Sequence, residues 1–228
     1  MTEPKPVLDY LIRPAKTQNT KAPALILLHG YGSNKEDLFS FQAYLPQDHT
    51  VIALEAPLTL MPGGYAWYEL HFTATPEKWT DVVQAQKSLQ LIRQQLHYLI
   101  PTYNLDAADI SLIGFSQGAI LSWSLGLDYP KEFRRILALS GYIHTDLLKQ
   151  PLEHYTHILA FASHGTEDPV LPLSLPQATI PLVQARNPEI VFKTYPAPHT
   201  INQANFEDLL QWLNQTRQKP DRASDQSG

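Results

Sequence analysis

Ser116 is the residue of this sequence best placed to act as a nucleophile. It stands at the centre of Gly-Phe-Ser-Gln-Gly over residues 114–118, after an apolar run at 110–113 and before a helical pattern at 119–127. A G-x-S-x-G sequence between a strand and a helix is typical of a sharp turn that exposes a serine hydroxyl. Because that hydroxyl is a weak nucleophile at neutral pH, acyl transfer by Ser116 would require a base within hydrogen-bond reach.

His199 is the predicted base. The sequence has nine histidines, and His199 follows the last predicted strand, in Pro-Ala-Pro-His-Thr over residues 196–200. In folds that carry such a turn, the serine, the acid and the histidine follow one another along the chain. His164 is the alternative, because it also ends a strand downstream of Ser116, but it precedes the acids of its own loop.

Asp168 is the predicted acid that orients this histidine. It lies in His-Gly-Thr-Glu-Asp-Pro over residues 164–169, directly after an apolar run at 158–161. The proline that follows holds Asp168 in an extended or turn conformation, which suits a fixed carboxylate. Glu167 is the alternative. The acid would accept the second imidazole proton, fix the tautomer and stabilise the imidazolium.

Two backbone N–H groups are predicted to stabilise the oxyanion that forms in acyl transfer. Such donors must point at the oxygen where negative charge develops. The first is the N–H of Gln117, which follows the nucleophile at the start of its helix, and the second is the N–H of Tyr31. Tyr31 lies in His-Gly-Tyr-Gly over residues 29–32, after the first central strand, where two glycines permit close approach of a substrate.

The elements that must position these residues alternate between strands and helices. Short continuous apolar runs bounded by turn residues are typical of strands buried on both faces of a parallel sheet. Between them, apolar residues recur every three or four positions, as in amphipathic helices. The expected strands are residues 24–28, 51–54, 110–113, 136–139, 158–161 and 190–195, with an edge strand at 7–13.

Capping signals predict where the helices begin. Thr75-Pro76-Glu77 predicts the start of a long helix that ends at Pro101, and Ser33 to Glu36 has the spacing of a capping box. Asn202 precedes a final helix. Residues 173–187 are ambiguous, because Pro176 and Pro181 could start, kink or divide a helix there.

The predicted fold class is therefore α/β, with a mostly parallel, doubly wound sheet. Alternation of strands and helices implies right-handed crossovers, and open sheets of this kind place ligands at the carboxyl ends of their strands. We expect residues 1–216 to form a single domain. Residues 217–228 are polar and have no apolar period, and we expect them to be disordered.

Composition excludes several other classes of function. There is no cysteine, and hence no disulfide framework, thiolate metal site or cysteine nucleophile. The net charge of −5 gives no electrostatic reason to expect nucleic acid as a partner. No apolar stretch is long enough for a transmembrane segment, and the first residues lack the apolar region of a secretory signal, so we expect a cytoplasmic protein. His154 and His157 have no third ligand nearby, and we predict no metal site.

The motifs as a set resemble those of the phospholipase/carboxylesterase family, which includes small carboxylesterases and acyl-protein thioesterases. The resemblance runs from about residue 25 to residue 213. It implies a minimal α/β-hydrolase fold without a large cap domain, and hydrolysis of carboxylic esters or thioesters without a cofactor. It also implies a small-molecule or lipid-like ester as substrate, and it is compatible with a homodimer. The matching positions are Ser116, Asp168 and His199 as triad, Tyr31 and Gln117 as oxyanion donors, and Trp67 and Tyr68 near the substrate groove.

The sequence departs from the family pattern at two positions. Tyr31 stands where members usually have leucine or another residue, and Pro198 stands where glycine usually precedes the catalytic histidine. Residues 58–75 are expected to form part of the groove. A lysophospholipase, an acyl-protein thioesterase, a peptidase or a C–C hydrolase would keep the same triad, and a non-catalytic binding protein of this fold would be expected to have lost a member of it.

Overall fold

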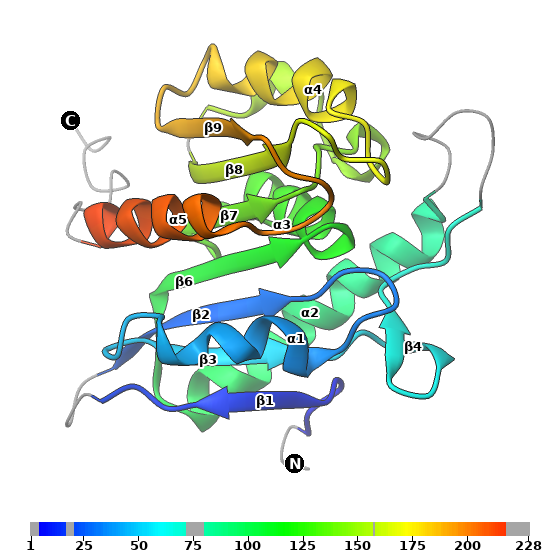
Figure 1. Ribbon diagram of the computed structural model, residues 1–228. Helices are drawn as coiled ribbons and strands as arrows, with labels where there is room; N and C mark the ends of the chain where they lie inside the picture. The colour runs from blue at the N-terminus through cyan, green and yellow to red at the C-terminus, as the bar shows by residue number, and fades with distance from the viewer. Residues whose placement is uncertain (1–4, 17–20, 72–79, 157, 218–228) are drawn as a thin grey trace.

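A seven-stranded sheet lies at the centre of the computed structural model, which describes residues 5–16, 21–71, 80–156 and 158–217 (Figure 1). Its strand order is β1-β3-β2-β6-β7-β8-β9. Strand β1 pairs with β3 in antiparallel fashion at one edge, and the other neighbours are parallel, as predicted. The strands are β1 (Tyr10–Arg13), β2 (Ala22–Leu28), β3 (Thr50–Leu54), β6 (Leu105–Phe115), β7 (Arg135–Leu139), β8 (Leu159–Gly165) and β9 (Ile190–Tyr195).

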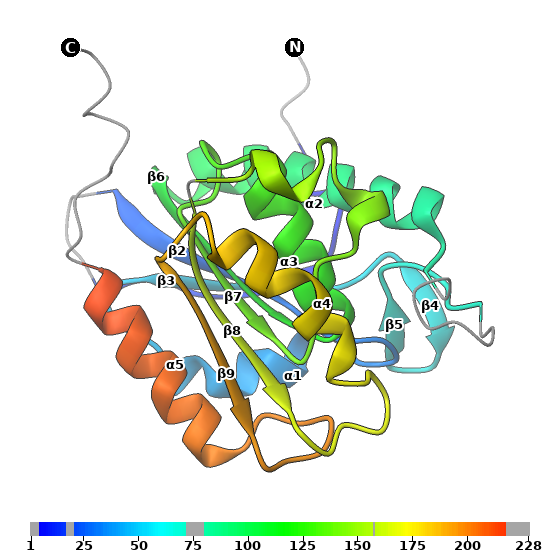
Figure 2. The same cartoon turned by 90° about the horizontal axis from the view of Figure 1, so that it is seen from above.

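Helices cover both faces of the sheet, which is why the central strands are apolar on both sides (Figure 2). In β2, Leu25 and Leu27 pack with residues of α1 and α5, whereas Ala24, Ile26 and Leu28 pack with residues of α2 and α3 on the opposite face. The side chains of a strand alternate between its faces, so one strand serves two cores. The helices are α1 (Lys35–Phe39), α2 (Val82–Thr102), α3 (Gln117–Asp128), α4 (Ser174–Gln184) and α5 (Gln203–Thr216).

The strand order reverses between β2 and β6. From β2 the chain continues outward to β3, and it then crosses back to β6 on the other side of β2. Ligands bind at such a reversal, outside the carboxyl ends of the strands. The loops that follow β2 and β6 carry residues 29–33 and 114–118, so the topology places the two glycine-containing motifs side by side.

Two predicted helix boundaries need correction. Helix α2 begins at Val82, where the Asp81 side chain accepts a hydrogen bond from the Gln84 N–H. The predicted start at residues 75–77 lies outside the described residues. The helix also continues through Pro101 to Thr102, because proline in a last turn costs only one hydrogen bond.

The capping residue of α1 also differs from the prediction. Asn34, and not Ser33, caps this helix, since its side chain accepts from the Glu36 N–H. Asn202 caps α5 as predicted, accepting from the Asn205 N–H. The ambiguous segment forms one undivided helix, α4, with Pro176 in its first turn and Pro181 inside it.

A small hairpin of β4 (Leu58–Met61) and β5 (Gly64–Ala66) occupies the first half of the expected groove segment. It packs on the loop after β2, where the Gly32 N–H donates to the Tyr65 carbonyl and the Tyr65 N–H donates to the Ser33 carbonyl, each at 2.8 Å. Residues 72–75 of that segment and 218–228 of the predicted tail lie outside the described residues. Within the described residues, no helix combines the length and apolar character needed to cross a membrane.

Candidate active site

Ser116 occupies a strained turn between β6 and α3. Its backbone has φ 53° and ψ −114°, an uncommon conformation for any residue other than glycine. The two flanking glycines allow the turn. A Cβ atom on Gly114 would lie 2.3 Å from the Gly118 carbonyl oxygen, and one on Gly118 would lie 2.0 Å from the Leu28 carbonyl oxygen. Neither position can therefore hold a larger residue without moving the backbone.

A continuous hydrogen-bonded chain joins the predicted triad. His199 Nε2 lies 3.0 Å from Ser116 Oγ, and His199 Nδ1 lies 2.6 Å from Asp168 Oδ2. The Phe115 ring packs against the imidazole, with the centroids 4.9 Å apart. This is the geometry in which a histidine can take a serine proton while a carboxylate fixes its tautomer.

The other predicted candidates occupy different places. His164 is fully buried, and its Nε2 lies 2.8 Å from the Leu171 carbonyl oxygen and 3.3 Å from Asp168 Oδ2, whereas the hydrogen bond to Ser116 Oγ comes from His199. Glu167 is exposed. The structure thus brings Asp168 and His199, rather than their alternatives, to Ser116.

The Asp168 carboxylate is fixed by its own loop. Its Oδ1 accepts hydrogen bonds from the N–H groups of Val170 and Leu171, at 2.8 and 2.9 Å, whereas Oδ2 faces His199 Nδ1 at 2.6 Å and His164 Nε2 at 3.3 Å. The acid loop also contacts the histidine loop, because the Glu167 N–H donates to the Ala197 carbonyl at 3.1 Å. Pro198 precedes His199, and Ala197, which accepts this hydrogen bond, precedes Pro198.

The predicted oxyanion donors lie on the two loops at the strand reversal. Gln117 is the first residue of α3, so its N–H has no partner within the helix. Gly30 lies against Ser116, since a Cβ atom on it would be 3.2 Å from Ser116 Cβ. The peptide that joins Gly30 to Tyr31 is therefore a direct neighbour of this serine. Among the described residues, neither the Tyr31 nor the Gln117 N–H donates a backbone hydrogen bond.

Trp67 and Tyr68 do not line a groove. Both side chains are 0% exposed and belong to the core between the sheet and α2, so they present no surface to a substrate. We therefore correct their predicted role from substrate contact to support of the site. Their backbone reaches the elbow, because the Gln117 side chain accepts from the Trp67 N–H at 3.0 Å and donates to the Tyr68 carbonyl at 2.7 Å.

Three buried histidines bind a proton less readily in this fold than in the unfolded chain. Burial lowers the pKa of His29, His49 and His164 below the ordinary value of 6.5, although Asp48 opposes this at His49 and the Leu171 carbonyl and Asp168 oppose it at His164. The unfolded chain takes up these protons near pH 6.5, whereas the folded chain does not. Folding stability therefore decreases as the pH falls below 6.5.

We expect the free energy of unfolding to be smaller at pH 5.5 than at pH 7.5, by at most about 1.4 kcal/mol per pH unit for each histidine. Urea unfolding followed by tryptophan fluorescence measures the difference. Ordinary carboxyl groups stay ionised over this window, so they contribute little. A free energy of unfolding that is constant from pH 7.5 to 5.5 would contradict this account.

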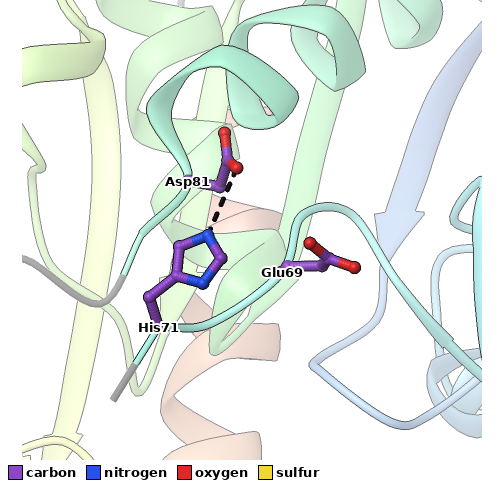
Figure 3. Close-up of side chains that lie close together, drawn as sticks. All are labelled: Glu69, His71 and Asp81. Atoms are coloured by element: carbon purple, nitrogen blue, oxygen red, sulfur yellow. Dashed lines mark hydrogen bonds and ion pairs between the residues drawn. The ribbon is translucent and has the colours of Figure 1, made fainter. Parts of the chain in front are cut away.

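A second group of titratable side chains lies where residues 69–71 pair with the segment before α2 (Figure 3). Ligand atoms of Glu69, His71 and Asp81 lie within 4.8 Å of one another. Each group has a protein partner: His71 Nε2 lies 3.3 Å from one Asp81 oxygen, the other Asp81 oxygen caps α2, and the Glu69 carboxylate accepts from Gln84. These contacts hold the segment against the start of the helix.

The chain is similar to known proteins of one family. The sequence profile of the phospholipase/carboxylesterase family matches residues 13–217. Acyl-protein thioesterase 1 of Debaryomyces hansenii is 25% identical over 227 residues, which cover 91% of this chain and 97% of that protein. Carboxylesterase SOBER1 of Arabidopsis thaliana is 25% identical over 167 residues, which cover 69% of this chain and 71% of that protein.

Solved structures show the same fold. Esterase PE8 superposes with a TM-score of 0.78 at 24% identity, over 91% of this chain and 98% of that one. The Bacillus cereus carboxylesterase has a TM-score of 0.75 at 17% identity, over 92% of this chain and 94% of that one. The fold is the α/β-hydrolase fold, without a large cap domain. With nearly its whole length matched, the chain belongs to the phospholipase/carboxylesterase family of serine hydrolases, which act on carboxylic ester bonds.

Proposed function

We propose that Ser116, His199 and Asp168 form a catalytic triad that hydrolyses carboxylic esters through an acyl-enzyme on Ser116. The observation that carries the proposal is the unbroken chain of hydrogen bonds from Ser116 Oγ through the imidazole to Asp168, with contacts of 3.0 and 2.6 Å. A base in contact with the hydroxyl, itself oriented by a buried carboxylate, is what a serine nucleophile requires.

In the first step, His199 Nε2 takes the Ser116 proton as Oγ bonds to the ester carbonyl carbon. The carbonyl oxygen becomes the oxyanion, which the Tyr31 and Gln117 N–H groups stabilise. The tetrahedral intermediate then collapses, and the protonated histidine gives its proton to the departing alcohol or thiol. Loss of one oxyanion donor typically removes about 3–4 kcal/mol of transition-state stabilisation.

In the second step, water replaces the leaving group. His199 takes a proton from the water as its oxygen bonds to the acyl carbon, and the same N–H groups stabilise the second oxyanion. The bond to Oγ then breaks, the histidine returns the proton to Ser116, and the carboxylic acid leaves. These steps consume one water and need no cofactor.

Exposed apolar side chains on segments that contact the site loops favour an apolar ester, either a small molecule or a lipid-like one. Tyr31, Met61 and Val170 are 40%, 59% and 48% exposed. Tyr31 lies on the oxyanion loop, Val170 donates its N–H to Asp168, and Met61 lies on the hairpin that packs on residues 32–33. An apolar acyl or alcohol group near Ser116 would cover part of this surface and gain hydrophobic free energy.

A thioester is the second candidate substrate, because acyl-protein thioesterase 1 of Debaryomyces hansenii aligns over 91% of this chain. A panel of one acyl group carried as a p-nitrophenyl ester, a thioester and an anilide separates the alternatives. We expect kcat/KM for the ester or thioester to exceed that for the anilide by at least about 100-fold. Faster anilide hydrolysis would indicate a peptidase, and no turnover of any of the three would favour a binding protein. Repeating the panel with acyl chains of increasing length then defines the substrate.

Three further proposals concern the domain organisation, the cellular compartment and the oligomeric state of the protein. The match of residues 13–217 to the family profile supports our proposal that residues 1–216 form a single domain. We also propose that the protein acts in the cytoplasm and that it can form a homodimer. Sedimentation velocity at micromolar concentration measures the oligomeric state directly.

A further inference from the structure

His29 is a buried histidine beside the predicted oxyanion donor. It is 1% exposed and directly follows β2, two residues before Tyr31. Both ring nitrogens have partners: the Ala56 N–H donates to Nε2 at 3.1 Å, and Nδ1 lies 2.7 Å from the Gly30 carbonyl oxygen. Because an amide N–H can only donate, Nε2 is the acceptor and the ring proton is on Nδ1, facing Gly30. The ring is a neutral imidazole of one tautomer.

The bond from His29 acts on the peptide whose N–H we assign to the oxyanion hole. In a planar trans peptide the C=O and N–H groups point in opposite directions. The Gly30 carbonyl accepts from His29 Nδ1 and also from the Ser33 N–H at 3.3 Å, so both bonds fix one side of this peptide. The Tyr31 N–H must then point to the other side, away from these donors. The Gly30 Cα in the same peptide lies against Ser116.

The ring itself is held in place. The Trp67 indole N–H donates to the His29 carbonyl at 2.9 Å, and the two rings lie 5.5 Å apart at 35°. Burial keeps the pKa of His29 below its ordinary value, which preserves the neutral tautomer. Protonation of Nε2 would place two N–H groups face to face, that of the ring and that of Ala56. The contacts around the ring therefore favour the neutral form.

We propose that His29 is a positioning residue for catalysis, which aims the Tyr31 N–H at the reacting carbonyl oxygen by holding the Gly30 carbonyl from the opposite side. The inference rests on the proposed function, in that it concerns the oxyanion hole of the Ser116 site. It adds a residue that touches neither substrate nor triad. A hydrogen bond to the carbonyl of a peptide also polarises its N–H, which strengthens the donor.

Two variants of similar size separate the two ring contacts. In His29→Asn, the amide nitrogen can take the place of Nδ1 and donate to the Gly30 carbonyl, whereas the contact with Ala56 is lost. In His29→Gln, the longer side chain can accept from the Ala56 N–H, whereas the donor to Gly30 is lost. We expect kcat to fall on the order of 10-fold to 100-fold in the glutamine variant. The asparagine variant should recover most of this loss, and KM should change little in either.

A trifluoromethyl ketone reports on the oxyanion hole alone. Ser116 Oγ bonds to its carbonyl carbon, the serine proton goes to His199, and the carbonyl oxygen becomes a stable oxyanion in the hole. The inhibition constant should therefore rise in the glutamine variant in proportion to the loss of kcat/KM, and much less in the asparagine variant. His49→Gln is the matched control, since His49 is also buried but lies at the amino-terminal end of β3, and it should change neither quantity.

Equal loss of kcat in the two His29 variants, or unchanged ketone inhibition in the glutamine variant, would overturn the inference. If neither variant folds, nitrogen NMR of the wild-type protein identifies the tautomer of His29. An Nδ1–H tautomer would support the inference, and an Nε2–H tautomer would overturn it. Failure of the proposed function has a different result: the wild-type protein itself would then neither hydrolyse esters nor bind the ketone.

Discussion

Ser116→Ala is expected to lower kcat for ester hydrolysis by about a millionfold, with little change in the fold. The substitution removes the Oγ atom that forms the acyl-enzyme, and alanine meets the same backbone strain that serine meets at φ 53°. Residual hydrolysis would come from water attacking an ester bound at the oxyanion donors. Steady-state kinetics with a p-nitrophenyl ester, at enzyme concentrations high enough to detect the residual rate, measures the loss.

Ser140→Ala is the matched control for this variant. Ser140 also follows a strand, is buried and has a positive φ of 52°, but its backbone N–H pairs with the Ser163 carbonyl and no hydrogen bond joins it to His199. We expect its kcat to stay within a few-fold of wild type. More than about 1% of wild-type kcat in Ser116→Ala, measured on protein free of wild-type contamination, would mean that another group is the nucleophile.

Asp168→Asn is expected to lower kcat by about 10⁴-fold. The loop around residue 168 fixes how the asparagine amide is oriented. Because Asp168 Oδ1 accepts hydrogen bonds from two backbone N–H groups, only the amide oxygen of asparagine can take its place. The amide nitrogen must then face His199 Nδ1. It can only donate, so the histidine proton moves to Nε2, the atom that has to accept from Ser116. The variant would keep the geometry and hold the wrong tautomer.

Glu167→Gln is the matched control for Asp168→Asn. Glu167 is the exposed neighbour that the sequence alone left as an alternative, and the same charge change there should leave kcat unchanged within a few-fold. Urea unfolding of both variants checks that the losses do not come from instability. If Glu167→Gln lost more activity than Asp168→Asn, the assignment of the acid would be wrong.

The sequence was sufficient to predict the fold and the order of the site because both depend on local patterns. Fully apolar strand segments predict a sheet covered on both faces, and the residues that follow those segments must gather at one edge. Ser116, Asp168 and His199 were predicted in this way, and the structure brings their side chains together. The strained turn at Ser116 could also be anticipated, since glycines at 114 and 118 are the residues that such a turn needs.

The features that the sequence did not predict depend on contacts between distant parts of the chain. The burial of Trp67 and Tyr68 follows from packing against α2 and from pairing with the Gln117 side chain, which no local pattern reveals. The cap of α2 at Asp81 also lies next to a contact between distant residues, the pairing of residues 70 and 80, which the local sequence does not show. The role of His29 was also missed. Its only signal in sequence was its position at the end of β2, next to the glycine of the oxyanion loop.

The most direct test of the central claim is covalent labelling of the wild-type protein with a fluorophosphonate probe. The activated serine should attack phosphorus and displace fluoride, so the intact mass should rise by one probe adduct, and peptide mapping should locate it on Ser116. Ser116→Ala should not be labelled. Absence of an adduct on the folded wild-type protein, or an adduct on another residue that persists in Ser116→Ala, would contradict the assignment of Ser116 as the nucleophile of a serine hydrolase.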